Sequence, residues 1–236
     1  MLEICVDTIA SAEAAVRGGA GRIELCAALS EGGLTPSVGL MRAAAALPIP
    51  VFAMIRPRAG LFDASASEMK IMLEDIAAAR NAGLSGVVLG VQDTDGGLHM
   101  AHLAALKHAA GELGTTLHRV IDVVPDPLKA IDQAAELGID RVLTSGGAAQ
   151  AVAGVNMIAQ MVTRAAGRLS VMPGCGVTVV NVAEILLRTG AHEVHASCAT
   201  PPSGDAAFSN FDPIGGRKET SETVVRAMTR EINSSL

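Results

Sequence analysis

The segment Arg22-Ile23-Glu24-Leu25-Cys26 alternates two kinds of side chain, and Ala27-Ala28-Leu29-Ser30-Glu31-Gly32-Gly33 follows it as a glycine-containing loop. Ile23 and Leu25 share one face of the predicted strand, whereas Glu24 and Cys26 share the other. In a parallel barrel both faces of a strand are buried, one against helices and the other inside the barrel. A carboxylate and a thiol that face inward near the strand's end are costly unless they bind or react with something. The segment therefore indicates a barrel strand that ends at a functional site.

The same unit, a short apolar strand followed by an alanine-rich helix, recurs eight times in the 236 residues. The predicted strands are 2–6, 22–26, 51–55, 86–89, 116–120, 141–144, 170–172 and 193–195. The predicted helices are 11–17, 37–47, 67–81, 99–113, 127–137, 151–166, 181–188 and 221–233. This alternation favours an α/β fold, a single (β/α)8 TIM barrel over residues 1–236, rather than a doubly wound sheet. Residues 201–216 are predicted to form an irregular loop before the last helix.

Composition and charge exclude several classes of function. The chain has 18 basic and 24 acidic residues, a net charge of −6, no Trp, no Tyr and four Phe, which argues against nucleic-acid binding. The first βα turn carries no G-x-G-x-x-G motif, so no nucleotide cofactor is expected. No apolar run reaches the ~20 residues of a membrane span. The acidic N-terminus is unlike a signal peptide, and four cysteines without a regular framework fit a reducing compartment, so we expect a cytoplasmic protein.

Polar or glycine residues follow nearly every predicted strand, where TIM barrels gather their functional groups. A purely structural barrel has no need of several charges at one mouth, because desolvating each unpaired charge costs several kcal/mol. The alternative is that these charges pair with one another in a static ion network. The residues in question are Cys5, Asp7, Glu24, Cys26, Arg56, Arg58, His118, Arg119, Asp122, Ser145, Gly146, Gly174, Cys175, Gly176, His195, Ser197 and Cys198.

Six motifs stand out along the chain: Glu3-Ile4-Cys5-Val6-Asp7, Gly21-Arg22-Ile23-Glu24-Leu25-Cys26, Met54-Ile55-Arg56-Pro57-Arg58, His118-Arg119, Arg141-Val142-Leu143-Thr144-Ser145-Gly146 and Met172-Pro173-Gly174. Together they resemble the CutC copper-homeostasis family over most of the chain, at least from residue 2 to residue 198. The resemblance implies a cytoplasmic TIM-barrel protein that is a homo-oligomer (a dimer or tetramer) and is associated with copper tolerance and, in some members, with Cu(I) binding. It places the metal-ligand candidates at Cys5 and Cys26. Cys175 departs from the family's Gly-Gly-Gly turn and adds a thiol of unassigned role.

Copper chemistry is compatible with this pair of cysteines. Cu(I) prefers thiolate and thioether ligands at low coordination number, so two cysteines suffice where zinc wants four ligands. Cys5 and Cys26 have the inward parity on neighbouring strands, with Cys26 the first candidate and Cys5 the second. The alternative is that both are small buried hydrophobic residues, which is how free cysteines usually behave.

The polar mouth also fits an enzyme or a binder of a small phosphorylated or carboxylated metabolite. The candidate catalytic residues are Glu24, His118, Asp122 and His195, since these groups transfer protons. Guanidinium groups hold anions bidentately, and glycine-rich turns offer backbone N–H groups. The candidate anion-binding residues are Arg56, Arg58, Arg119, Ser145, Gly146, Gly174, Gly176 and Ser197. A third possibility is an oligomeric scaffold whose mouth is only an ion network.

Overall fold

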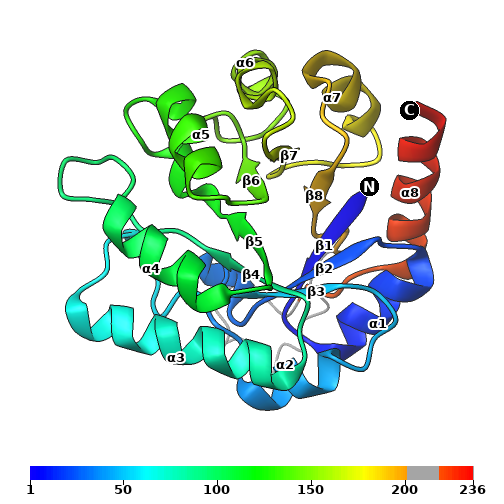
Figure 1. Ribbon diagram of the computed structural model, residues 1–236. Coiled ribbons are helices and arrows are strands. Elements are labelled where there is room, and N and C mark those ends of the chain that lie inside the picture. The colour runs from blue at the N-terminus through cyan, green and yellow to red at the C-terminus, as the bar shows by residue number, and fades with distance from the viewer. Residues whose placement is uncertain (201–217, 236) are drawn as a thin grey trace, which may run out of the picture.

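The computed structural model describes residues 1–200 and 218–235, and Figure 1 shows its helices arranged around a central set of strands. The strands are β1 (Leu2–Val6), β2 (Arg22–Leu25), β3 (Val51–Met54), β4 (Gly86–Leu89), β5 (Gly114–Leu117), β6 (Arg141–Thr144), β7 (Ser170–Pro173) and β8 (Val194–Ala196). The α-helices are α1 (Ile9–Gly18), α2 (Val38–Ala44), α3 (Ala66–Ala82), α4 (Met100–Ala110), α5 (Pro127–Glu136), α6 (Val155–Ala165), α7 (Val182–Thr189) and α8 (Glu222–Ser235). Two 3-10 helices, η1 (Leu29–Glu31) and η2 (Arg119–Asp122), lie in the loops after β2 and β5.

The strands form one parallel sheet in the order β7-β6-β5-β4-β3-β2-β1-β8, which is the order of a TIM barrel. Within the described residues, the ladder is open only between β7 and β8. The C-terminal helix α8 lies beside α1 (Figure 1), and Arg17 Nε contacts Glu222 Oε2 at 2.9 Å. The predicted (β/α)8 barrel is therefore confirmed. The loop predicted over residues 201–216 lies outside the described residues.

Several predicted boundaries differ from the structure by a few residues, and three of these differences have a clear local reason. Strand β5 ends at Leu117 instead of residue 120, because His118 Nδ1 accepts the Val120 N–H at 3.1 Å and begins the 3-10 turn η2. Helix α4 stops at Ala110, where Gly111 has a positive φ of 58°. Helix α6 begins at Val155 rather than residue 151, with Gly154 as its N-cap.

The alternation predicted for β2 sets the two layers of the core. Ile23 and Leu25 are fully buried in the large apolar cluster between strands and helices, together with Ile4 of β1. Glu24 belongs to the other face, inside the barrel, and faces Cys5 across the β1–β2 ladder. Among the described residues, no helix is both long and apolar enough to cross a membrane.

Phe52 of β3 fills the middle of the barrel because two neighbouring strands have glycine at the same level. A Cβ added to Gly86 would lie 2.4 Å from the Phe52 ring, and one added to Gly114 would lie 2.6 Å from it. The guanidinium carbons of Arg22 and Arg141 lie 5.3 and 5.5 Å from the ring centroid. The ring is thus enclosed by two glycine-bearing strands and two cations, a contact that favours the charged groups there.

We expect Gly114→Ala to destabilise the protein by about 1–3 kcal/mol, because the new methyl group overpacks against Phe52. Adding Phe52→Leu should recover part of that loss, since the smaller side chain makes room for the methyl group. Urea unfolding of the two single variants and the double variant measures this coupling. Strictly additive free energies would contradict the steric explanation.

Candidate functional site

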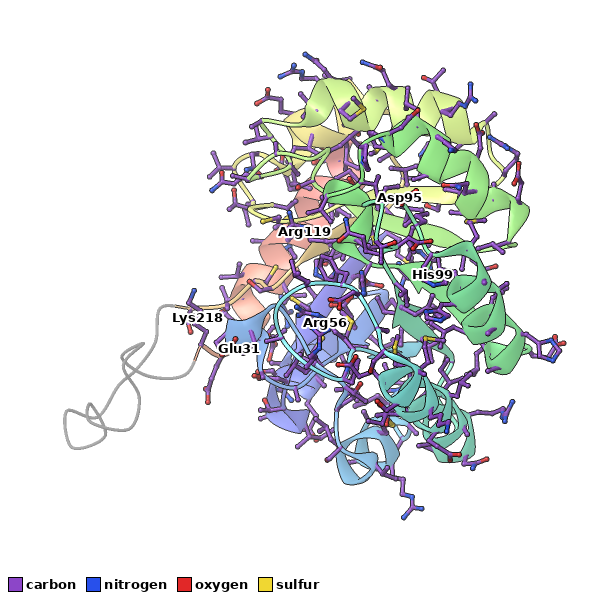
Figure 2. All side chains as sticks on the ribbon, turned by 90° about the vertical axis from the view of Figure 1, so that its left-hand side faces the viewer. Glu31, Arg56, Asp95, His99, Arg119 and Lys218 are labelled. Carbon is purple, nitrogen blue, oxygen red and sulfur yellow. The ribbon has the colours of Figure 1, made fainter. Side chains whose placement is uncertain are left out.

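A cavity of about 560 Å³ opens at the C-terminal ends of the strands. Its lining comes from strand ends and loops on most sides of the barrel, as the site rule for this fold requires. Arg56, Arg119 and Glu31, three of the lining residues, are labelled in Figure 2. The lining residues are Cys5, Glu24, Leu29, Glu31, Gly32, Met54, Arg56, Phe62, His118, Arg119, Asp122, Val123, Leu143, Cys175, Gly176, Val177, Thr178, His195, Ala196 and Ser197.

Three of the predicted residues form a compact group on one wall of this cavity. A ligand atom of each of Cys5, Glu24 and His195 lies within 4.8 Å of the others, a separation that suits one shared metal ion. The barrel ladder brings them together, because Cys5 pairs with Glu24 across β1–β2 and β8 borders β1 on the other side. We call this group the thiol–imidazole cluster. It is the one such group that the described residues contain.

Glu3, which the sequence analysis did not single out, orients the histidine of this cluster. Glu3 Oε1 lies 2.7 Å from His195 Nδ1, and the same carboxylate binds the Arg22 guanidinium. His195 Nε2 is left facing the cluster, 3.8 Å from Glu24 Oε2. A carboxylate behind an imidazole in this way is the usual support of a metal-binding histidine. The signal was present in the sequence, since Glu3 has the same inward parity as Cys5.

Burial and neighbouring charges shift the pKa values of the cluster in different directions. Burial would raise the pKa of Glu3, but the hydrogen bond from His195 and the charge of Arg22 lower it to about 2. Burial would lower the pKa of His195, yet Cys5 and Glu24 raise it well above 6.5. Burial raises the pKa of Glu24. The surroundings therefore favour the charged forms of Glu3 and His195 and the protonated form of Glu24.

Cys26 lies next to the thiol–imidazole cluster and outside it. Its Sγ is 3.6 Å from Glu24 Oε2, and the side chain packs with Phe52, Met54 and Val88 inside the barrel. Burial and the charge of Glu24 raise the pKa of Cys26 well above 9.0. Its inward parity is as predicted, but the surroundings keep it a thiol.

The loops that follow β3 and β5 carry two of the predicted residues, Arg56 and His118. Because His118 Nδ1 accepts the Val120 N–H, the ring proton is assigned to Nε2, which has no partner. Burial and the charge of Arg56 lower the pKa of His118 to about 3, so the ring is neutral. Arg56 Nε is also buried without a partner.

Asp122 belongs to η2, and its carboxylate reaches into the turn after β6. It occupies the position where an external anion was expected to bind. It accepts the N–H groups of Ser145 and Gly147 at 3.0 Å and the Thr144 hydroxyl at 2.6 Å. The Gly146 N–H is also satisfied, by Thr144 Oγ1 at 2.8 Å. The predicted backbone donors of this turn are thus already bound to the protein's own oxygens.

Arg119, Arg58 and Gly174 are also engaged within the protein. Arg119 lines the cavity but donates to Asp122 and to Ser145 Oγ, both at 2.8 Å. Arg58 does not line it, since its guanidinium pairs with Asp63 at 3.0 Å and with Glu68. The Gly174 N–H donates to the Thr144 carbonyl at 2.9 Å.

The turn after β7 and the end of β8 contribute Gly176, Ser197 and Cys175 to the cavity. Cys175 has a left-handed φ of 73°, a conformation that favours glycine. Its thiol donates to the Ala149 carbonyl at 3.1 Å, away from the thiol–imidazole cluster.

The fold and this mouth define a TIM-barrel protein with a cysteine–histidine–carboxylate cluster. The family model that matches the chain is the CutC family, over residues 1–200, and the chain belongs to that family. A CutC family protein of Agrobacterium fabrum is 50% identical over 232 residues, covering 97% of this chain and 92% of that protein. One of Sinorhizobium medicae is 48% identical over 231 residues, covering 97% and 94%.

Solved structures agree with this assignment. A CutC structure from Streptococcus agalactiae, named for copper homeostasis, superposes with a TM-score of 0.80 at 31% identity, covering 84% of this chain and 98% of that one. A thiamine phosphate pyrophosphorylase of Pyrococcus furiosus reaches a TM-score of 0.64 at 16% identity, covering 100% of this chain and 96% of its own. That second likeness shows the barrel fold alone.

The buried neutral His118 should make stability depend on pH. Its pKa is about 3 in the folded chain and near 6.5 when unfolded, so below pH 6.5 only the unfolded chain takes up the proton. The free energy of unfolding should therefore fall as the pH drops, by up to about 1.4 kcal/mol per pH unit. His118→Asn keeps an acceptor near the Val120 N–H but has no titrating ring. In urea unfolding between about pH 6.5 and pH 5, its free energy of unfolding should lack the pH-dependent decrease caused by His118. Equal slopes for the two proteins would contradict it.

Proposed function

We propose that this chain serves copper homeostasis by binding Cu(I) at the barrel mouth, with Cys5 Sγ and His195 Nε2 as its first ligands. The observation that carries the proposal is the thiol–imidazole cluster, whose ligand atoms lie within 4.8 Å of one another. Membership of the CutC family and the copper-homeostasis name of the Streptococcus agalactiae relative support it.

The donor set fits a soft monovalent metal. A thiolate is the ligand that Cu(I) prefers, and imidazole also binds copper well. The Glu3 carboxylate, 2.7 Å from His195 Nδ1, fixes the ring so that Nε2 is presented to the metal. Glu24 brings a carboxylate, a harder ligand, which suits the role of proton acceptor better than that of a copper ligand.

Cys26 and Glu24 would then act as a pair beside the bound ion. The Cys26 thiol donates toward Glu24 Oε2 at 3.6 Å, so this carboxylate is placed to take the thiol proton if Cys26 joins the metal. Since Cys26 lies outside the cluster and its thiol is stabilised by burial, we assign it a smaller share of the affinity than Cys5.

We infer a reducing, cytoplasmic setting for this activity. All four cysteines, Cys5, Cys26, Cys175 and Cys198, are free thiols in the structure. Disulfides are rare where glutathione keeps thiols reduced, which is also where Cu(I) is the stable copper ion to be bound by thiolates. That the chain assembles into a homo-oligomer remains a prediction from its sequence.

An anaerobic Cu(I) competition titration against a chromophoric chelator tests the site. We expect one tight Cu(I) per chain in the wild type, at least tenfold weaker binding in Cys5→Ser and a smaller loss in Cys26→Ser, because only the first removes a ligand of the cluster. Cys175→Ser is the matched control, since that thiol is bound to the Ala149 carbonyl. Undiminished binding in Cys5→Ser would refute the assignment.

The affinity should also depend on pH, because Cu(I) must displace a proton from each of its two proposed ligands, the Cys5 thiol and the His195 ring. Cys5 and Glu24 raise the pKa of His195 well above 6.5 against the effect of burial, which favours the protonated ring in the metal-free protein. Binding should therefore tighten as the pH rises, by about tenfold per pH unit for each proton released. The same competition titration repeated across neutral pH gives the slope. A pH-independent affinity, after correction for the chelator, would exclude Cys5 and His195 as the pair of ligands.

A further inference from the structure

Cys26 is shut off from the cavity, although residues in contact with it line that cavity. The side chain is fully buried and is not part of the lining. Glu24, whose Oε2 lies 3.6 Å from the thiol, and Met54, from the same apolar cluster, both line the cavity. A thiol has to reach the cavity surface before it can bind an incoming metal or meet a reagent. Whatever covers Cys26 therefore controls its chemistry.

Residues 28–33, which we call the covering loop, lie over the Cys26 thiol. A Cβ added to Gly33 would lie 3.0 Å from Cys26 Sγ, so the loop backbone is in close contact with the sulfur. Leu29 packs against the apolar cluster that contains Cys26, and Leu29 also lines the cavity. The covering loop thus has Cys26 on one side and the cavity on the other.

The covering loop has little packing of its own to keep it in place. Its 3-10 turn η1 contributes no buried residue, and Ala28 before it has a left-handed φ of 47°, a conformation that costs free energy for a residue with a Cβ. At its base, Ala27 and Leu34 exchange two backbone hydrogen bonds, of 2.8 and 2.7 Å. Segments with little buried surface and a strained residue are those that open most easily, and here the base pair supplies a fixed end.

Arg56 supplies the hydrogen bonds that fasten the covering loop to the barrel. Its Nη1 donates to the carbonyls of Glu31 and Gly33 at 2.9 and 3.2 Å (Figure 2). Its Nη2 donates to the carbonyl of Gly60, in the loop after β3, at 2.9 Å. Within the part of the chain that the structure describes, the two Nη1 bonds are the hydrogen bonds that join residues 28–33 to the rest of the molecule. A charged donor makes such bonds stronger than neutral ones.

We propose that the covering loop opens and closes over Cys26, and that Arg56 is the positioning residue that keeps it closed. The structure shows the closed state, in which the thiol is out of reach. When Arg56 Nη1 releases the carbonyls of Glu31 and Gly33, the loop turns about its base and the thiol faces the cavity beside Glu24.

This control of Cys26 is argued from packing and hydrogen bonds, and it does not depend on copper. Its use rests on the proposed function: an open loop would deliver a further thiol to a Cu(I) ion already held by Cys5 and His195. The closed loop explains why Cys26 contributes less to the affinity than Cys5.

The test is alkylation of the metal-free full chain by iodoacetamide, followed at each cysteine by mass spectrometry of its peptides. We expect Arg56→Gln to speed the alkylation of Cys26 by about 10- to 100-fold, since two hydrogen bonds that oppose opening are lost. Cys198, which is also buried, reports on unfolding of the whole chain, and its rate should not rise with that of Cys26.

Arg58→Gln is the matched control. Arg58 also donates to carbonyls of the loop after β3, those of Leu61 and Asp63 at 3.1 Å, but makes no hydrogen bond to the covering loop among the described residues. Its replacement should leave the Cys26 rate at the wild-type value. Because no copper is present, the result is independent of the titration with Cys5→Ser that tests the metal site.

Three outcomes would overturn the proposal: an unchanged Cys26 rate in Arg56→Gln, an equal acceleration in Arg58→Gln, or an equal acceleration of Cys26 and Cys198. If Arg56→Gln does not fold, the wild type is alkylated in urea below about 1 M. Opening of a short loop exposes little surface, so the Cys26 rate should hardly change with urea. A Cys26 rate that rises as steeply as global unfolding also overturns the proposal.

Discussion

A single buried carboxylate, Glu3, connects the floor of this barrel to its mouth. One of its oxygens binds Arg22 of β2, and the other lies against His195 of β8. Arg22 reaches Glu193 at 2.6 Å, and Glu193 in turn binds Arg141 at 2.6 Å. Removing one member of such a network leaves its partners charged and unpaired in a low dielectric, which costs several kcal/mol. The orientation of His195, and with it the chemistry of the cluster, therefore depends on Glu3.

The barrel itself could be predicted because its signals are local. The alternation of Ile23 and Leu25 with Glu24 is explained by a strand buried on both faces, and the repeated strand–helix pattern leaves few other folds. The strand-end rule also placed Cys5, Glu24, His118 and His195 at one mouth, where the cavity has them. These predictions needed only the periodicity of the chain and the geometry of parallel strands.

Which of the mouth residues are paired within the protein and which are free could not be predicted, because this depends on side-chain rotamers and loop conformations. The sequence pattern predicts that the N–H groups of Ser145 and Gly146 are free to bind an anion. In the structure the Asp122 carboxylate accepts the first and the Thr144 hydroxyl accepts the second. The static-network alternative therefore holds for this part of the mouth. It fails on the walls that carry Glu24 and His118, where buried polar atoms stay unpaired.

The packing of Phe52 determines how a ligand can enter and leave the barrel. The ring fills the space left by Gly86 and Gly114, and Arg22 and Arg141 lie against it. The interior of the barrel is therefore filled below the mouth. Anything that reaches Cys5 or His118 enters and leaves through the same opening.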